Sequence, residues 1–459
     1  MLDKHLLVKL KSIVGKEDIL TSKISREVYA YDSSPFIHEP EAVVFPETTA
    51  EVAEILKLSE AYSIPVVPRG AGTCLSGGAV SLYGGISLVL TKMDKILDID
   101  TVNETALVET GVTNLNLQKA VEPLGFMFAP DPASQKAATI GGNVAECAGG
   151  IRGVKYGVTK DHVLGLEVVL PGGEIVTTGA LASGYGFIPD LTGIFSGSEG
   201  TFGIITKILV KLTVMPETMR TMMAVFDSLD KAGEAVSAII AKGIVPTTLE
   251  IMDKSMIRAV DDFLKLGFPR DAEAVLLLEV DGYEVEIDRQ VDVIEEIFRE
   301  KKASSVQSAK DRTEREKLWL ARRSGNGALG RIKPAYMVQD ITVPRHRLPQ
   351  MLRFVSDISK KYDITIAQMA HAGDGNLHPH LLYDPDDPEE FERVEEASHE
   401  IFETALKMDG TLTGEHGIGL EKLPFMKLQF SEKDISFMKR VKKALDTNLN
   451  LNKGKVLEL

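Results

Sequence analysis

Two glycine-rich loops that are almost free of acidic residues constrain this chain more than any other feature of its sequence. The first occupies residues 68–78 (PRGAGTCLSGG), and the second runs from Ala133 to Gly150 (ASQKAATIGGNVAECAGG). The windows 64–78 and 133–145 carry neither Asp nor Glu, although the chain has a formal net charge of −15. Glycine lets backbone N–H groups converge on an anion, and a nearby carboxylate would repel that anion. The loops therefore indicate a phosphate or pyrophosphate ligand.

The spacing of the glycines argues against the common nucleotide-binding motifs. The sequence G-x-x-x-x-G-K-[ST] of a P-loop is absent, and Leu75 stands where the third glycine of a dinucleotide fingerprint belongs. Arg69, Lys136, Arg152 and Lys155 add positive charge in or next to the loops. A purely structural role of both loops as tight turns is the alternative interpretation.

Composition narrows the class of protein. The 459 residues are 44% hydrophobic, which is enough for the cores of two large domains or about three smaller ones. With 67 acidic against 52 basic residues, the chain lacks the clustered positive charge of a nucleic-acid binder. Two cysteines exclude a disulfide scaffold, and no apolar run approaches the roughly 20 residues of a membrane-spanning helix. Because the N-terminus also lacks the apolar core of a signal peptide, we expect a cytoplasmic protein with no nucleic-acid partner and no integral membrane segment.

Hydrophobic periodicity changes near residue 216 and predicts a division of the chain there. Before this point, residues 41–69 have the pattern strand–helix–strand, with Thr48 and Glu51 at capping-box spacing, which favours parallel pairing of the two strands with a right-handed crossover. After it, short strands alternate with charged amphipathic helices, which predicts a largely antiparallel sheet with helices on one face. These helices are expected at about 228–242, 283–302, 313–329, 347–361 and 387–408.

Four of the nine histidines fall in two short motifs, HAGDGNLHPH and GEHGIG. A hairpin between two strand patterns can bring His371 and His378 together from opposite strands. His380 shares a strand face with His378, and Glu415–His416 lies between two glycines. Two imidazoles and one carboxylate, with coordination positions left over, form an open metal site suited to zinc, iron(II) or manganese(II). A polar turn network without metal is the alternative, and a zincin is excluded because HExxH is absent.

The two loops, together with FSGSEGTFGIIT, resemble the FAD-binding domain of the vanillyl-alcohol-oxidase superfamily over roughly residues 30–215. In that family the first loop wraps the pyrophosphate of FAD, and the second passes along the pyrophosphate and the isoalloxazine. Members with covalent FAD often carry a histidine where this chain has Thr73, so the resemblance implies non-covalent FAD. The implied cofactor contacts are Arg69, Gly70, Gly72, Thr73, Ser76, Ser134, Thr139, Gly142, Asn143, Ala145, Gly149, Tyr156, Gly157, Glu199, Ile205 and Asn452.

The two histidine motifs resemble the second-domain signatures of the FAD-linked D-2-hydroxy-acid dehydrogenases, and this resemblance extends over nearly the whole chain, from about residue 20 to the last. It implies a divalent metal bound by His371, His378 and Glu415, with His416 as the catalytic base. The segment LWLAR is similar to a family segment whose arginine grips the substrate carboxylate, which points to Arg322.

The resemblance also implies the fold and the role of each part of the chain. The expected fold class is α+β, with a two-part FAD-binding domain of the vanillyl-alcohol-oxidase type and an α/β cap domain that has a largely antiparallel sheet. The FAD-binding domain is expected at residues 1–215, and the cap or substrate domain, with the metal-binding loop, at 216–410. The segment 411–459 ends in LNKGKV, similar to the family's LNPGKV, and is expected to complete the flavin site.

By this resemblance the chain is expected to oxidise a small D-2-hydroxy acid, D-lactate first and glycolate second, to the 2-oxo acid. The metal lowers the pKa of the substrate hydroxyl, His416 removes its proton, Arg322 holds the carboxylate, and hydride passes to flavin N5. Val338 stands where relatives specific for 2-hydroxyglutarate carry a lysine, with Arg323 and Lys333 the cations nearby.

The electron acceptor is expected to be a separate protein, because the chain has no cysteine cluster for an iron–sulfur centre. An electron-transferring flavoprotein or an iron–sulfur subunit would serve. Four alternatives remain at the level of sequence: a D-2-hydroxyglutarate dehydrogenase, an alkyl-dihydroxyacetone-phosphate synthase, a metal-dependent hydrolase of a phosphorylated substrate, and a nucleotide-binding scaffold without activity.

Overall fold

The computed structural model describes residues 2–183, 189–269 and 271–459. The chain forms two compact units, each with its own sheets and its own core. Unit 1 comprises residues 1–149, 157–215 and 415–459, and unit 2 comprises 150–156 and 216–414. The chain therefore leaves unit 1 twice and returns to it for its last segment.

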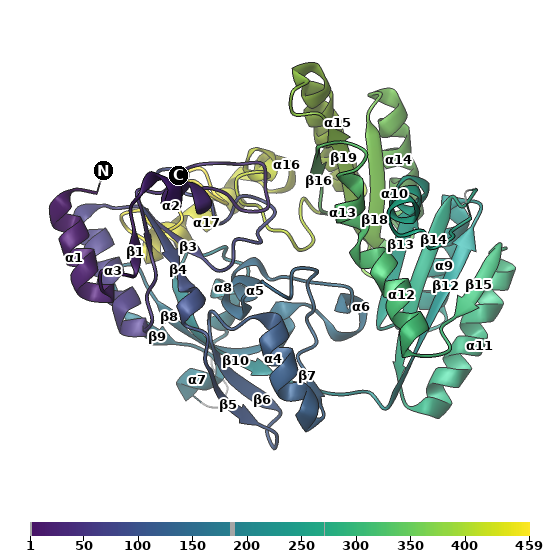
Figure 1. The fold of residues 1–459 in the computed structure, drawn as a ribbon, viewed down its shortest axis with the longest axis horizontal. Coiled ribbons are helices and arrows are strands. Elements are labelled where there is room, and N and C mark those ends of the chain that lie inside the picture. Colours follow the sequence, from purple (N-terminus) through teal and green to yellow (C-terminus); the bar gives the residue numbers. More distant parts are fainter. Residues whose placement is uncertain (1, 184–188, 270) are drawn as a thin grey trace. The chain divides into compact units, whose positions relative to one another are not determined.

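Unit 1 contains two larger sheets and one short strand pair (Figure 1). The first sheet has the order β1 (Ile19–Leu20), β2 (Ala42–Val44), β4 (Ile86–Val89), β3 (Val66–Arg69), antiparallel between β1 and β2 and parallel elsewhere. The second is antiparallel, with the order β5 (Ile96–Asp100), β6 (Thr105–Glu109), β10 (Ile204–Lys211), β8 (Val163–Val169), β9 (Ile175–Thr177). The strand β7 (Phe126–Met127) pairs with β11 (Thr213–Val214).

The helices of unit 1 pack on these sheets and carry the connections between them. They are α1 (Lys4–Val14), α2 (Lys23–Val28), α3 (Thr49–Tyr62), α4 (Asn114–Val121), α5 (Ile140–Glu146), α7 (Ala180–Ser183), α8 (Thr192–Phe195), α16 (Met426–Gln429) and α17 (Glu432–Leu445), with short 3-10 turns η1 (Leu90–Lys92), η2 (Glu122–Leu124), η3 (Thr159–His162) and η5 (Leu423–Phe425).

The predicted strand–helix–strand unit is present, with one correction. The capping box of α3 is confirmed, because Thr48 Oγ1 accepts the N–H of Glu51 at 3.2 Å and the Glu51 carboxylate accepts the N–H of Thr48 at 3.3 Å. The two strands run parallel, but β4 lies between them, so the predicted direct pairing is wrong. All four residues of β4 are buried, which suits the central position, where a strand is covered by neighbours on both edges.

Unit 2 is built on an antiparallel sheet of eight strands, and this confirms the predicted α+β class. The order is β15 (Ser305–Ser308), β12 (Thr218–Phe226), β14 (Ala274–Gly282), β13 (Thr248–Asp253), β18 (Thr365–His371), β19 (Asn376–Tyr383), β16 (Ala335–Val338), and β17 (Ile341–Thr342) pairs with another part of β19. The helices are α6 (Gly153–Tyr156), α9 (Leu229–Ala241), α10 (Lys254–Leu264), α11 (Glu284–Glu300), α12 (Arg312–Arg323), α13 (Gly325–Leu329), α14 (Leu348–Lys361) and α15 (Pro388–Lys407), with the 3-10 turn η4 (Arg345–Arg347).

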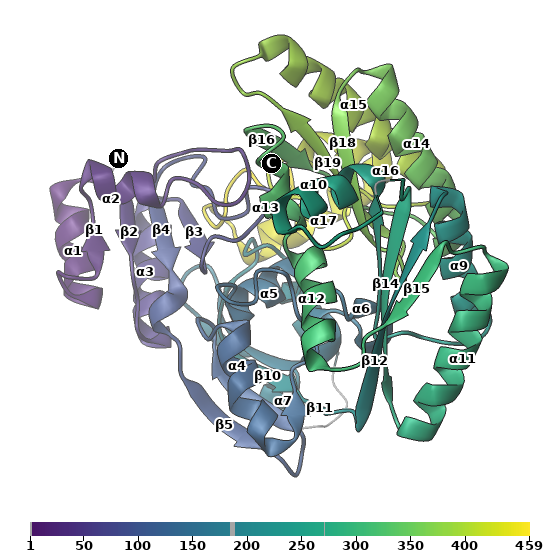
Figure 2. The ribbon, with the colours of Figure 1, turned by 45° about the vertical axis from the view of Figure 1, so that its right-hand side comes forward.

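Helices cover both faces of this sheet, so the prediction of helices on one face is wrong. Figures 1 and 2 show α10, α12 and α13 on one side and α9, α11, α14 and α15 on the other. Adjacent residues of β12 point to these two opposite faces. Val225 packs in one hydrophobic cluster with Met256 of α10. The ring of Phe226 packs against that of Phe298 in α11, with 6.1 Å between the ring centroids. The continuous apolar run of β14 is the signal of burial on both faces.

No helix in the described part of the chain is both long enough and apolar enough to cross a membrane.

Candidate functional site

A hairpin in unit 2 carries three of the four motif histidines. Strands β18 and β19 pair with Met369 opposite His378 and His371 opposite Asn376, which confirms the predicted hairpin. The rings of His371 and His378 meet edge to face, with 5.1 Å between their centroids. A ring nitrogen of each lies within 4.8 Å of the other, so both can face one small ligand.

A buried carboxylate stands behind the first of these imidazoles. Glu250, in the middle of β13, lies 2.7 Å through Oε1 from Nδ1 of His371, and its Oε2 accepts the Nε–H of Arg322 at 2.7 Å. Burial alone would raise the pKa of the Glu250 carboxyl, but His371 and Arg322 outweigh burial and hold that pKa below its ordinary value. Glu250 was not predicted, although an acidic residue inside the apolar run TLEIM is a signal of a buried, partnered carboxylate.

Arg322 belongs to α12, and only one of its donor groups bonds to Glu250. Its Nε–H is used by Glu250, while its two terminal amino groups bond to no residue in the described part of the chain. Its side chain is 11% exposed. Two coplanar donors at such a position suit a carboxylate ligand.

The second imidazole lies near another buried carboxylate. His378 Nδ1 is 3.8 Å from Oδ1 of Asp340, whose Oδ2 accepts the Thr413 hydroxyl at 2.6 Å and the N–H of Gly414 at 2.9 Å. Asp340 thereby fixes the backbone immediately before Glu415. Asp340 was not predicted; in the sequence it stands with Gln339 as a polar pair before an apolar segment.

His380 has a structural role. Its Nδ1 lies 2.8 Å from the carbonyl oxygen of His378, and its Nε2 lies 3.0 Å from Oδ1 of Asn326. Burial, followed by the neighbouring His378, lowers the pKa of His380 to about 3. Both ring nitrogens are therefore engaged by protein groups, and the imidazole is neutral.

The donor set of unit 2 fits a divalent metal. Two imidazoles face each other, and Nδ1 of His371 lies at hydrogen-bond distance from a buried carboxylate, the arrangement that orients a metal-binding histidine and fixes its tautomer. Nδ1 of His378 has the Asp340 carboxylate nearby, at 3.8 Å. Imidazole nitrogen suits zinc and iron(II), as the sequence predicts. Of the predicted ligands, the structure brings His371 and His378 together within this unit.

Glu415 and His416 belong to unit 1, where both lie against the glycine-rich loops. A Cβ atom on Gly149 would collide with the Glu415 carboxylate, so only glycine permits this approach. The backbone carbonyl of His416 accepts the Ser76 hydroxyl at 2.7 Å. The segment that carries the predicted base is thus anchored to both loops.

The two glycine-rich loops meet in unit 1. A Cβ atom on Gly70 would lie 2.5 Å from Oγ1 of Thr139, the N-cap of α5. The N–H groups of residues 71–73 donate to no acceptor among the described residues, and the buried Nδ2 of Asn143 likewise has no partner there. Adjacent unused donors on a glycine-rich backbone form a cradle for phosphate, so these residues fit the pyrophosphate of FAD.

All but one of the predicted cofactor residues belong to unit 1. Arg69 ends β3, and Gly70, Gly72, Thr73 and Ser76 follow in the first loop; Ser134, Thr139, Gly142, Asn143, Ala145 and Gly149 lie in the second loop and α5; Gly157, Glu199, Ile205 and Asn452 come from three further segments. Tyr156 belongs to unit 2, where its hydroxyl donates to Oδ2 of Asp281 at 2.9 Å. The helix α5 was not predicted, because its two glycines mask a helical turn that Thr139 caps.

Asn452 joins the C-terminal segment to the first loop. Its Nδ2 donates to the carbonyls of Gly78 at 3.1 Å and Glu199 at 2.6 Å. Lys455 Nζ donates to Oδ1 of Asn452 at 2.6 Å and to Gly78 at 2.7 Å. The Glu199 carboxylate accepts the N–H groups of residues 418 and 419 at 2.6 and 2.7 Å. Predicted flavin contacts thus also hold the C-terminal segment in place.

Acidic side chains from outside the windows do approach the first loop. A Cβ atom on Gly78 would lie 2.8 Å from both the Glu146 carboxylate and the Cys74 thiol. Burial, reinforced by Glu199, raises the pKa of Glu146 well above its ordinary value. Burial lowers the pKa of Lys455 to about 7, although the surrounding acids oppose this shift. The absence of acids therefore holds for the local sequence but not for the surroundings of the loop in the fold. Burial favours the neutral form of the Glu146 carboxyl and so limits the negative charge near the loop.

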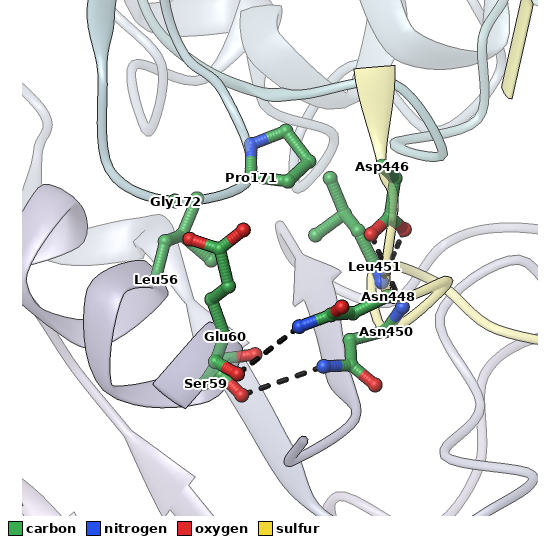
Figure 3. Close-up of a pocket in the computed structure, with 9 residues that line it drawn as sticks. All are labelled: Leu56, Ser59, Glu60, Pro171, Gly172, Asp446, Asn448, Asn450 and Leu451. Atoms are coloured by element: carbon green, nitrogen blue, oxygen red, sulfur yellow. Dashed lines mark hydrogen bonds between the residues drawn. The ribbon is translucent and has the colours of Figure 1, made fainter. Parts of the chain in front are cut away.

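A small cavity on unit 1 lies between α3, the turn after β8 and the C-terminal segment (Figure 3). Its volume is about 10 Å³, roughly what one water molecule needs. Two asparagines at its wall bind α3, since Asn448 donates to the carbonyl of Glu60 at 3.1 Å and Asn450 to that of Ser59 at 3.4 Å. This cavity is too small for a substrate. It lies where the C-terminal segment packs against α3.

Comparison with known proteins gives two family matches. The family described as "FAD linked oxidases, C-terminal domain" matches residues 215–456, and the "FAD binding domain" family matches residues 40–179.

Individual relatives agree with these matches. The chain is 44% identical to the glycolate oxidase subunit GlcD of Bacillus subtilis, over 99% of this chain and 97% of that protein. It is 35% identical to a probable mitochondrial D-lactate dehydrogenase of Danio rerio, over 99% and 92% of the two chains. Among solved structures, p-cresol methylhydroxylase has a TM-score of 0.82 at 18% identity, over 97% of this chain and 95% of that one, which shows the shared vanillyl-alcohol-oxidase fold.

Proposed function

This chain belongs to the FAD-linked oxidases and is an FAD-dependent oxidoreductase of the glycolate oxidase and D-lactate dehydrogenase type, and we propose that it oxidises a small D-2-hydroxy acid. D-lactate is the first candidate and glycolate the second. Membership in this family supports an oxidoreductase over a hydrolase or an inactive scaffold. The glycine-rich loops, Asn143 and the C-terminal segment of unit 1 would hold the FAD, which supplies the two-electron acceptor when bound.

One observation carries the choice of a monocarboxylate. Val338 occupies the place of the lysine that a second carboxylate would need, and both cations nearby in the sequence are paired with acids of their own unit. Arg323 lies 2.9 Å from the carboxylate of Glu316, and Lys333 lies 3.1 Å from that of Glu390. Arg322, with two unused donors, is left as a carboxylate ligand for a substrate that has one such group. A D-2-hydroxyglutarate dehydrogenase is therefore the weaker candidate.

We assign the remaining roles from the sequence motifs and the donor set of unit 2. His371 and His378, joined by Glu415, would hold a divalent metal that acidifies the substrate hydroxyl. His416 accepts the hydroxyl proton, since imidazole changes its charge near neutral pH. Arg322 orients the carboxylate through its terminal amino groups. The electrons would leave to a separate protein, either an electron-transferring flavoprotein or an iron–sulfur subunit.

The test is anaerobic reduction of the bound flavin by a panel of D- and L-2-hydroxy acids. We expect rapid bleaching of the flavin absorbance with D-lactate or glycolate, and slow or no bleaching with D-2-hydroxyglutarate and L-lactate. Chelator treatment is expected to abolish the reaction, and a divalent ion to restore it. Fastest reduction by D-2-hydroxyglutarate would contradict the monocarboxylate proposal, and full activity in metal-free protein would contradict the role of the metal.

A further inference from the structure

We propose that Glu250 is a positioning residue that sets the tautomer of His371 and the orientation of Arg322 together. This inference deepens the proposed function and rests on it for its catalytic meaning. The geometry itself lies wholly within unit 2, on β13, β18 and α12. Glu250 is 1% exposed, and each of its carboxylate oxygens serves one partner.

The tautomer follows from the donors that meet at this carboxylate. An ionised carboxylate is acceptor-only, so the Nδ1 atom of His371, 2.7 Å from Oε1, must carry the hydrogen. The other ring nitrogen, Nε2, then holds the lone pair and is the atom that can bind a metal. The charged guanidinium of Arg322 at Oε2 keeps Glu250 an acceptor and keeps this assignment fixed.

The same carboxylate aligns the arginine. Because Oε2 takes the Nε–H of Arg322, the plane of the guanidinium is restrained, while its two terminal amino groups form no hydrogen bond with Glu250. A single buried acid thus couples a metal ligand to the group proposed to hold the substrate carboxylate. Loss of Glu250 would disturb both at once.

The substitution Glu250→Gln makes a sharp test because it preserves size and removes one acceptor. Glutamine offers one carbonyl oxygen to two donors, and the charged guanidinium, which cannot accept a hydrogen bond, is expected to take it. The glutamine NH₂ then faces Nδ1 of His371, so Nδ1 becomes the acceptor and the hydrogen moves to Nε2. The variant should therefore hold His371 in the tautomer that cannot bind a metal through Nε2.

A matched control lies on the adjacent strand. Glu279 of β14 is also buried, at 3% exposure, and accepts from Arg315 Nε at 2.7 Å and Nη2 at 3.0 Å and from Trp319 Nε1 at 3.1 Å. Neither of these partners is a histidine. Glu279→Gln should lower stability to a similar extent, while the tautomer of His371 and the metal affinity stay as in the wild type.

The primary measurement is the imidazole ¹⁵N chemical shift in metal-free protein labelled at histidine, with His371 assigned by its loss in His371→Asn. We expect an Nδ1–H tautomer in the wild type and in Glu279→Gln, and an Nε2–H tautomer in Glu250→Gln. An Nδ1–H tautomer in Glu250→Gln would overturn the inference. This measurement requires neither metal nor substrate, so it succeeds or fails independently of the proposed function.

Two further measurements connect the geometry to function. In competition with a chromophoric chelator, Glu250→Gln should bind zinc roughly 10–100-fold more weakly than the wild type, with flavin content unchanged. Its KM for the hydroxy acid should rise because a neutral amide oxygen holds the guanidinium of Arg322 less firmly than a carboxylate does. Zinc affinity and KM both equal to those of Glu279→Gln would overturn the coupling. If the wild type binds no zinc but the tautomer changes as expected, the positioning role stands and the metal part of the proposed function falls.

Discussion

The substitution Lys442→Met should destabilise unit 1 by removing a buried ammonium on which the C-terminal segment depends. The side chains of Lys442 and Asp446 are 3% and 2% exposed and form an ion pair of 2.6 Å. Lys442 Nζ also donates to the carbonyls of Thr201 at 2.6 Å and Leu451 at 2.8 Å. One cation therefore joins α17, the segment before β10 and the segment that carries Asn452.

The magnitude follows from what the substitution leaves behind. Methionine fills most of the volume, but the Asp446 carboxylate and two carbonyls remain buried without the ammonium. Breaking a buried ion pair by removing one partner costs about 3–5 kcal/mol of unfolding free energy. For a unit of about 250 residues, this corresponds to a fall of roughly 6–20 °C in melting temperature.

The assay is thermal unfolding followed by circular dichroism, with retained flavin measured after gel filtration. Lys443→Met is the matched control, because its side chain is exposed on the same helix and its loss should change stability by less than about 0.5 kcal/mol. Adding Asp446→Asn to Lys442→Met should recover part of the loss, since it removes the unpaired charge. A melting temperature of Lys442→Met within 2 °C of the control would refute this reasoning.

Three further predictions concern unit 1. Lys455→Met should flatten the pH dependence of stability. The folded pKa of about 7 lies below the ordinary 10.5, so between these values the unfolded wild type binds more protons than the folded protein. Its unfolding free energy therefore rises by up to about 1.4 kcal/mol per pH unit, a gain that the variant lacks and that melting temperatures from pH 7 to 10 would show. His416→Ala should keep its flavin but lose roughly 10²–10⁴-fold in flavin reduction rate; reduction at the wild-type rate would remove His416 from its role. Gly149→Ala should displace the Glu415 carboxylate and lower the metal content, and an unchanged metal content by atomic emission would contradict this.

Sequence patterns predicted most of the elements because their periodicity is strong. The capping box of α3 and the hairpin that joins His371 to His378 were found from spacing alone. The order of β2, β4 and β3 was not, because local sequence does not record which later strand inserts between two earlier ones. The second helical layer of unit 2 was missed although the apolar run of β14 indicates it.

The candidate site was predictable where its residues stand in motifs and hidden where they stand alone. Glycines and histidines at short spacing identified the loops and the hairpin. Glu250, Asp340 and Lys455 are single polar residues in apolar or unremarkable surroundings, and their partners lie 121, 38 and 377 residues away in the chain. Only the fold brings such pairs together, so no local pattern could have assigned their partners.

The bridge between β3 and the C-terminal segment has a consequence for biosynthesis. Val66 donates its N–H to Asn450 and accepts the N–H of Asn452, so the edge of β3 is closed by backbone made almost 400 residues later. A nascent chain on the ribosome exposes that edge throughout the elongation of unit 2. We therefore expect stable binding of FAD to wait until translation has passed Asn452, with the edge of β3 open to unwanted strand pairing in the meantime.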